Sequence, residues 1–266
     1  MKPLATAGRP ALTAPVRPNV SIGVAYRRRL LAMIEAMHRD VLDHVERGWR
    51  ETPPRMAMDV LPASAFRDMM DRLRNHWVDR FEEFGKAAGK RFAEGSMAQT
   101  DRAFAATLRD MGFTIQFKLT PVIRDVLSAT IGEQVGLIRG IAERHMADAQ
   151  GMVMRSITAG YDVGRLRNDL QTTFGMTKKR AALIARDQNS KAVASITRAR
   201  QIEVGITRAI WLHSLGGKVP RPEHIAMNGK PYDIAKGAFL EGVWTWPGKE
   251  INCRCVSKSI IPGLEP

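Results

Sequence analysis

The two cysteines of the chain and a histidine upstream of them are the residues best suited to metal chemistry. Cys253 and Cys255 lie in the stretch "EGVWTWPGKEINCRCVSKSI", which also holds two of the five tryptophans. His213 and His224 precede this stretch. Thiolate and imidazole are the ligands that tetrahedral zinc prefers. One hypothesis is therefore a zinc site formed by His224, Cys253 and Cys255, with His213 as a less favoured ligand.

The spacing of the two cysteines argues against this site. Zinc cysteines usually have about two to four residues between them, and a one-residue gap in a strand places the side chains on opposite faces. A turn or bulge at Arg254 would bring the sulfurs together. A disulfide between them would close a very small ring, which its geometry disfavours. The alternative interpretation is that His224 and the cysteines are packed, hydrogen-bonded core residues covered by Trp244 and Trp246.

A hydrolase or nuclease is a further hypothesis, with His224 as the general base. It also needs a nearby carboxylate, for which the candidates are Asp187, Glu223 and Asp233. A cation must hold the phosphate, and the candidates are Arg221 and Arg254. These acids are scattered along the sequence, and no nucleophile elbow, P-loop or HExxH helix is present. We therefore assign no catalytic residue and expect that the protein is not an enzyme.

The charge of the chain indicates contact with a polyanion. The 41 Lys and Arg residues exceed the 27 Asp and Glu residues, and the formal net charge is +14. Nucleic acid is the commonest partner of so basic a protein. Residues 177–200 carry one acid and seven basic residues, which are the candidate DNA contacts: Lys178, Lys179, Arg180, Arg186, Lys191, Arg198 and Arg200. The alternatives are an ordinary solvated helix face and an acidic protein partner.

The composition indicates a helical protein. A chain of 266 residues forms one large domain or two small ones, and its 44% hydrophobic content is ample for a core. Aromatic residues are few and the 14 methionines favour helices over sheets. No apolar run reaches the roughly 18 to 20 residues of a membrane span. The proline-rich residues 1–20 lack the apolar core of a secretion signal, so we expect a flexible arm and an intracellular protein.

The spacing of apolar residues predicts a series of helices. One covers residues 20–50, a second begins near Ser64 as its cap, and a third covers 98–111. The alternation in residues 113–117 suggests a short extended piece. The most regular pattern begins at Pro121 and predicts one long helix, or two in line broken near Gly136 or Gly140. His145 lies on its apolar stripe, as a core histidine does. A short helix is then expected to end at Gly175, and Thr177 to cap another over 178–203.

Beyond residue 205 the composition changes: glycine, proline and aromatic residues become frequent, and the apolar runs are short. It predicts a small α+β module with strands near 206–212, 242–246 and 253–258. The expected fold is mainly α with this small C-terminal α+β module. The expected regions are an arm at 1–20, a helical N-terminal region at 21–120, a long-helix and basic-helix region at 121–204, and the module at 205–266.

An ordered set of motifs connects the chain with a known family. They are "ITAGYDVGRLRNDL", "GMTKKRAALIARDQ", "GITRAIWLHS", "RPEHIAMNGKPYD" and "NCRC". Together they resemble the Mu F-like phage head morphogenesis family, from about residue 123 to 256. The matching residues are Asp187, Trp211, Arg221, His224, Gly229, Cys253, Arg254 and Cys255. The family often has an acid between the tryptophan and the Arg-His pair, and "SLGGKVP" has none. It also usually has Thr or Asn where this chain has Gln188, and residues 1–120 match only in being helical.

The resemblance implies a minor head protein, a structural component of the virion with few copies per head. Its expected partners are portal or capsid proteins and packaged DNA, with several copies at the portal vertex. Its expected location is the head interior, and the host cytoplasm during assembly. No cofactor is expected unless zinc binds the Cys pair. The alternatives are a metal-dependent nuclease or toxin-like enzyme carried in the head, and a nucleic-acid-binding module without a virion role.

Overall fold

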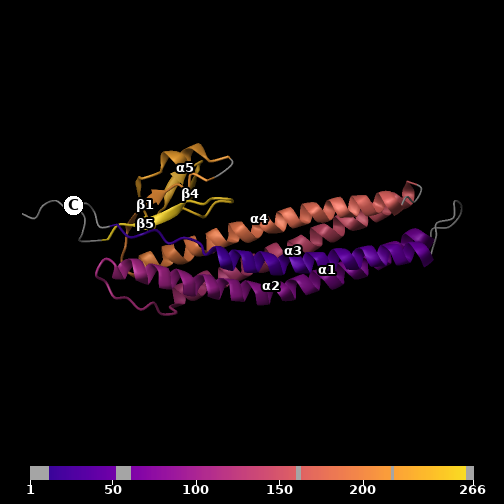
Figure 1. The fold of residues 1–266 in the computed structure, drawn as a ribbon, viewed down its shortest axis with the longest axis horizontal. Coiled ribbons are helices and arrows are strands. Elements are labelled where there is room, and N and C mark those ends of the chain that lie inside the picture. Colours follow the sequence, from indigo (N-terminus) through magenta and orange to yellow (C-terminus); the bar gives the residue numbers. More distant parts are fainter. Residues whose placement is uncertain (1–11, 52–60, 160–162, 217–218, 262–266) are drawn as a thin grey trace, which may run out of the picture. The chain divides into compact units, whose positions relative to one another are not determined.

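The computed structural model describes residues 12–51, 61–159, 163–216 and 219–261. The chain is mainly α-helical with short strands near its C-terminus, which confirms the expected fold class (Figure 1). The long helices are α1 (Val20–Glu51), α2 (Leu61–Arg109), α3 (Pro121–Thr158) and α4 (Val163–Glu203). None of the helices in the described part of the chain combines the length and apolarity that crossing a membrane requires.

The chain forms two compact units, and each long helix contributes to both. The helical unit comprises Val24–Lys90 and Ile131–Ala185. Of the residues that the structure describes, the mixed unit comprises those within Met1–Gly23, Arg91–Thr130 and Arg186–Pro266, and it contains every strand found among them.

The helical unit is held by apolar stripes at three- and four-residue spacing. Buried members include Leu30, Ile34, Met37 and Val41 of α1, Met70, Leu73, Trp77 and Phe81 of α2, and Ile138, Ala142, Met146 and Ala149 of α3. This spacing places apolar side chains on one face of each helix, where neighbouring helices cover them. The predicted helical stripes of α1, α2 and α3 are therefore confirmed.

Glycines in the helical unit allow helices to approach closely rather than ending them. A Cβ added to Gly85 would lie 3.2 Å from the Cα of Val135, and one on Gly89 would lie 3.2 Å from the Cβ of Gln134. Helix α2 runs unbroken through both glycines, so the prediction of a separate helix over 98–111 was wrong. Ser64 lies within α2 and does not precede it.

The predicted helix end at Gly175 is also absent, and of the two alternatives for the segment from Pro121 the single long helix is confirmed. Helix α3 is a single helix through Gly136 and Gly140, and α4 continues through Gly175. A glycine inside a helix costs only about 1 kcal/mol relative to alanine, which the burial of an apolar face offsets. Thr177 is not a cap either, because its hydroxyl donates to the carbonyl of Thr173 one turn earlier.

The mixed unit is built around a three-stranded antiparallel sheet. Strand β1 (Arg208–Leu212) lies between β2 (Pro231–Asp233) and β5 (Val256–Ser259). Strands β3 (Ala238–Leu240) and β4 (Val243–Thr245) form a separate pair, and α5 (Pro222–Ala226) precedes β2. Strands β1, β4 and β5 match predicted ones. Strands β2 and β3 were not predicted, and residues 113–117 form no strand.

The N-terminal segment is attached to this sheet. Leu12 forms an isolated bridge with Ile260, and the backbone N–H of Thr13 donates to the carbonyl of Ser259 at 3.1 Å. Thr13 and Val16 are buried. The described part of the predicted arm is therefore part of the mixed unit, while residues 1–11 lie outside the described residues.

Candidate functional site

Three buried side chains of the mixed unit converge on one point. The Nδ1 of His224, on α5, lies 3.5 Å from the Sγ of Cys253 and 3.8 Å from the Sγ of Cys255. One ligand atom from each residue lies within 4.8 Å of those of the other two. The three residues are 2%, 5% and 4% exposed, respectively. Within the described ranges they are the one such group of His, Cys, Asp and Glu, and it offers one nitrogen and two sulfurs to a ligand.

The two sulfurs meet because residues 251–255 are not a strand. Strand β5 begins only at Val256, and Asn252 adopts a left-handed conformation with φ of 60°. The alternation that would separate Cys253 from Cys255 therefore does not apply. Arg254, between them, is exposed and donates to the carbonyl of Gly216 at 2.7 Å. The turn that joins the sulfurs lies at residues 251–252, before Cys253, and not at Arg254 as the sequence suggested.

Gly248 supports the cluster and was missed by sequence reasoning. Its backbone N–H donates to the Sγ of Cys253 at 3.4 Å. Its φ is +86°, and an added Cβ would lie 2.9 Å from the Cβ of Ala194 and 3.3 Å from the carbonyl oxygen of Cys255. Only glycine adopts this conformation without strain and fits this space. The Pro-Gly pair in "TWPGKE" is the sequence signal that could have indicated it.

The cluster stabilises negative charge on sulfur. The pKa of Cys253 is lowered to about 5, chiefly by a hydrogen bond from the Cys255 thiol, and the Gly248 N–H and the charge of His224 contribute. The pKa of Cys255 is raised, first by its hydrogen bond to Cys253 and then by burial. The arrangement thus favours one thiolate between a thiol and an imidazole, and two thiolates require a further positive charge.

Trp211, and not Trp244, packs on the cluster. The fully buried indole of Trp211 meets the His224 ring edge to face, with centroids 5.1 Å apart. Trp244 is 54% exposed and contacts Phe239. Trp246 lies under the guanidinium of Arg198 at 4.1 Å. The expectation that the cysteines are buried is confirmed, and the expected cover by Trp244 is wrong.

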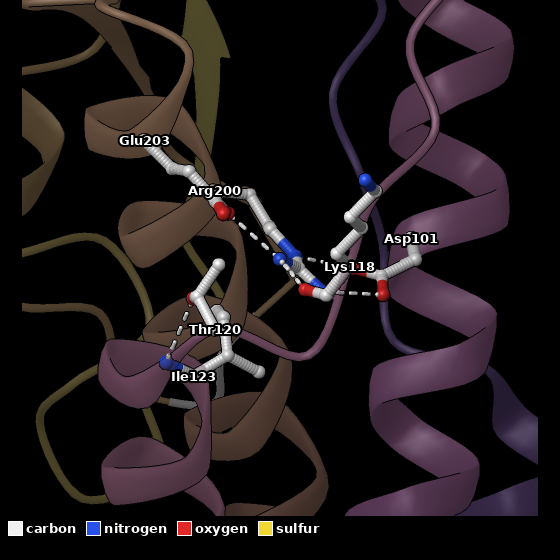
Figure 2. A network of polar contacts seen from close by, with 6 residues as sticks. All are labelled: Asp101, Lys118, Thr120, Ile123, Arg200 and Glu203. Atoms are coloured by element: carbon white, nitrogen blue, oxygen red, sulfur yellow. Dashed lines mark hydrogen bonds and ion pairs between the residues drawn. The ribbon is translucent and has the colours of Figure 1, made fainter.

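Arg200 is buried, and its guanidinium is held by a network of polar contacts that Figure 2 shows. Its Nε and Nη2 donate to the two carboxylate oxygens of Asp101 at 2.8 and 2.7 Å. Its Nη1 donates to Glu203 at 2.7 Å and to the carbonyl of Lys118 at 2.8 Å. Burial opposes its charge, but these acidic partners outweigh burial and raise its pKa. With 1% of its surface exposed, Arg200 does not lie where DNA could reach it, which corrects its assignment as a DNA contact.

Three more of the predicted DNA contacts are partly buried and make contacts within the protein. Arg198 donates to the carbonyls of Ile234 and Ala235. Lys191 pairs with Asp187 at 3.3 Å. Lys178 lies 4.5 Å from the centre of the Phe174 ring. Their side chains therefore have structural contacts besides any role with DNA.

The remaining predicted contacts are exposed. Lys179 and Arg180 belong to the helical unit, and Arg186 belongs to the mixed unit. Arg186 also donates to the side-chain oxygen of Asn252 at 3.1 Å. Sequence reasoning missed another exposed basic set on α1, made of Arg27, Arg28 and Arg29. Three consecutive arginines on a predicted helix were the available signal.

The acids of the nuclease hypothesis have other partners. Asp187 accepts from the backbone N–H of Asn252 at 2.7 Å, Asp233 accepts from that of Lys236, and Glu223 accepts from that of Glu241. None of the three joins the group formed around His224 in the part of the chain that the structure describes.

The other residues predicted from the family motifs shape the module. Arg221 pairs with Glu241 at 3.3 Å. Gly229 has φ of +80°, and its N–H donates to the carbonyl of Trp211 at 2.8 Å, so it forms the turn before β2. His213 accepts a hydrogen bond from the N–H of Leu215 and lies outside the His224 group.

Comparison with known proteins identifies this region. The family model for phage Mu protein F like proteins matches residues 147–258. An uncharacterized protein of Haemophilus influenzae is 26% identical over 259 residues. The alignment covers 94% of this chain but 56% of that relative, so the chain spans about half the relative's length. No solved structure matches the chain. The resemblance inferred from the sequence is confirmed: residues 147–258 are similar to the phage Mu protein F like family, and this match supports a phage head-related protein.

Proposed function

We propose that the protein is a phage minor head protein, a structural component that acts in head morphogenesis. The observation that carries the proposal is the match over residues 147–258, which ends within β5 and includes His224, Cys253 and Cys255. Residues far apart in this span meet in one module, so the match concerns a folded unit and not a short motif.

The proposed partners inside the head are DNA and the portal or inner capsid proteins. The net charge of +14 favours contact with a polyanion. Lys179, Arg180 and Arg186 are exposed and can reach phosphates, each contact releasing counterions. Association with a portal or capsid ring would place several copies of the chain at one vertex of the virion.

Deletion of the gene from the phage that encodes the chain tests the proposal. We expect fewer DNA-filled heads, with synthesis of the major capsid and tail proteins unchanged, and rescue by the intact gene supplied in trans. Heads that fill and mature normally without the chain would contradict a role in head morphogenesis.

We also propose that the protein acts without catalysis. Incubation of the purified chain with plasmid DNA and divalent metal ions should leave the plasmid supercoiled. Nicking that disappears in a His224→Gln variant would instead support the nuclease alternative.

A further inference from the structure

We propose that Nδ1 of His224 and the sulfurs of Cys253 and Cys255 bind one zinc ion, which holds the C-terminal module together. This inference is independent of the role in the phage head. It rests on the donor set, the distances between the donors, their burial and the way the chain is folded around them.

The distances from the histidine nitrogen to the two sulfurs suit a zinc ion. Zinc binds imidazole nitrogen at about 2.0–2.1 Å and thiolate at about 2.3 Å, so nitrogen and sulfur ligands of a tetrahedral ion lie roughly 3.6 Å apart. The His224 nitrogen lies 3.5 Å and 3.8 Å from the two sulfurs. These are edge lengths of a zinc tetrahedron.

The charges also balance. Two thiolates and a neutral imidazole around Zn²⁺ form a group with no net charge, which can be buried at far lower cost than an isolated ion. No carboxylate joins the group within the described ranges, so no extra negative charge needs compensation. The Gly248 N–H donates to the Cys253 sulfur, as expected of a group that supports a thiolate ligand.

A cavity borders the proposed site at one of its three ligands. Cys255 lines a cavity of about 340 Å³ together with Ser214, Gly216, Trp246 and Arg254. This cavity borders the proposed site at Cys255, and it has room for a water molecule that would supply the fourth ligand.

The ion would act as a cross-link in a module built of a short helix and short strands. It would join α5, a helix of five residues without a side-chain cap, to the turn before β5. The intervening chain contains β2, β3 and β4, each three residues long. Closing this loop with a metal contributes binding energy directly to folding.

Metal analysis of the full chain, purified under reducing conditions, tests the proposal. We expect one zinc per chain, and a lower melting temperature after chelation that recovers when zinc is added back. Cobalt substitution should give thiolate-to-cobalt charge-transfer absorption. Cys253→Ser, Cys255→Ser and His224→Gln should each weaken or abolish binding, whereas His213→Gln, the matched control, should retain one equivalent.

The wild-type measurement decides the matter even if the variants fail to fold. A folded, reduced chain that holds no stoichiometric zinc, either as purified or after zinc is added, would overturn the proposal. A mass two hydrogens lower than that of the reduced chain, under conditions that block thiol oxidation after lysis, would show that the cysteines form a disulfide and do not bind zinc. This result would also overturn the proposal.

Discussion

The carboxylate of Asp187 accepts a hydrogen bond from the backbone N–H of Asn252, 2.7 Å away. Asn252 has a positive φ and immediately precedes Cys253. The neighbouring Arg186 donates to the Asn252 side chain at 3.1 Å. Two consecutive residues of α4 therefore fix the turn that presents both sulfurs to His224, which gives the motif acid a structural role.

Asp187→Asn should destabilise the mixed unit. The carboxylate is nearly buried, and loss of its charge weakens its hydrogen bond with Asn252 and its pair with Lys191. We expect a loss of about 1–3 kcal/mol in the free energy of unfolding, measured by denaturant titration. Asp169→Asn makes the same chemical change at an exposed position of α4 and should have little effect. Equal stability of the two variants would contradict the role of Asp187.

Gly248→Ala should be more harmful than Gly242→Ala. Both glycines have positive φ, +86° and +79°, so both substitutions carry the strain of a left-handed alanine. At Gly248 the new Cβ would also meet Ala194 at 2.9 Å, whereas at Gly242 nothing lies within 4 Å. Thermal melts should therefore show a larger drop for Gly248→Ala. Similar melting temperatures would show that the contact of Gly248 with α4 is not tight.

Arg200→Ala should act on stability rather than on DNA affinity. It would leave Asp101 and Glu203 without their shared cation, and breaking a buried pair costs about 3–5 kcal/mol. Arg200→Lys should recover only part of this loss, because lysine cannot bind both Asp101 oxygens in the fork geometry. Denaturant unfolding measures the effect, and a fully stable Arg200→Ala variant would contradict it.

The proposed contact with DNA predicts that the exposed basic residues of α4, unlike Arg200, act on DNA affinity. Replacing Lys179, Arg180 and Arg186 with glutamine should weaken binding to non-specific DNA, and of the three changes only that at Arg186, which alters the hydrogen bond to Asn252, should lower the melting temperature. The slope of log affinity against log salt should fall by up to about 0.9 for each phosphate that the variant no longer neutralises. Replacing Arg27, Arg28 and Arg29 removes the same charge elsewhere. Equal decreases in affinity for the two triple variants would show that the total charge of the chain, and not the position of these residues on α4, determines DNA affinity.

Acid should destabilise the helical unit through His145. Its ring is buried and lies 5.9 Å from the ring of His38, and its Nδ1 donates to the hydroxyl oxygen of Thr177 at 3.0 Å, because that hydroxyl donates its own proton to Thr173. Burial first, and the charge of His38 second, lower its pKa from 6.5 to about 4. The unfolded chain therefore binds a proton that the folded chain does not, and stability present above pH 6.5 is lost as the pH falls toward 4.

Protonation of His145 should lower the free energy of unfolding by up to about 3 kcal/mol. His145→Gln should flatten the dependence of unfolding free energy on pH in this window. His76→Gln removes an exposed histidine of the same unit and serves as the control variant. An unaltered slope in His145→Gln would contradict the assignment.

The sequence predicted elements that carry a long periodic pattern. The stripe from Ile123 through Met146 specified α3 because many residues repeat one signal. Local breakers such as Gly175 were overvalued, since the burial of Leu170, Phe174 and Ala181 on the same helix outweighs one glycine. Strands β2 and β3 are too short for alternation to be visible, and only pairing with β1 and β4 defines them.

The site could be predicted in its members but not in its geometry. His224, Cys253 and Cys255 were recognisable as donor types, whereas their meeting depends on the left-handed Asn252, a feature of the folded turn. For Arg200 the sequence suggested a role that the structure contradicts. Its place in a basic stretch suggested DNA, and only its contact with Asp101, 99 residues away, reveals a buried ion pair.

The central claim is that this chain is a structural part of a phage head, and a reconstruction of the assembled head without imposed symmetry tests it most directly. Density for the helices and the C-terminal module should lie inside the head near the portal vertex, in a few copies per particle. Quantitative mass spectrometry of the same purified heads should give the same low copy number. Heads that contain no trace of the chain at any stage of assembly would contradict the claim.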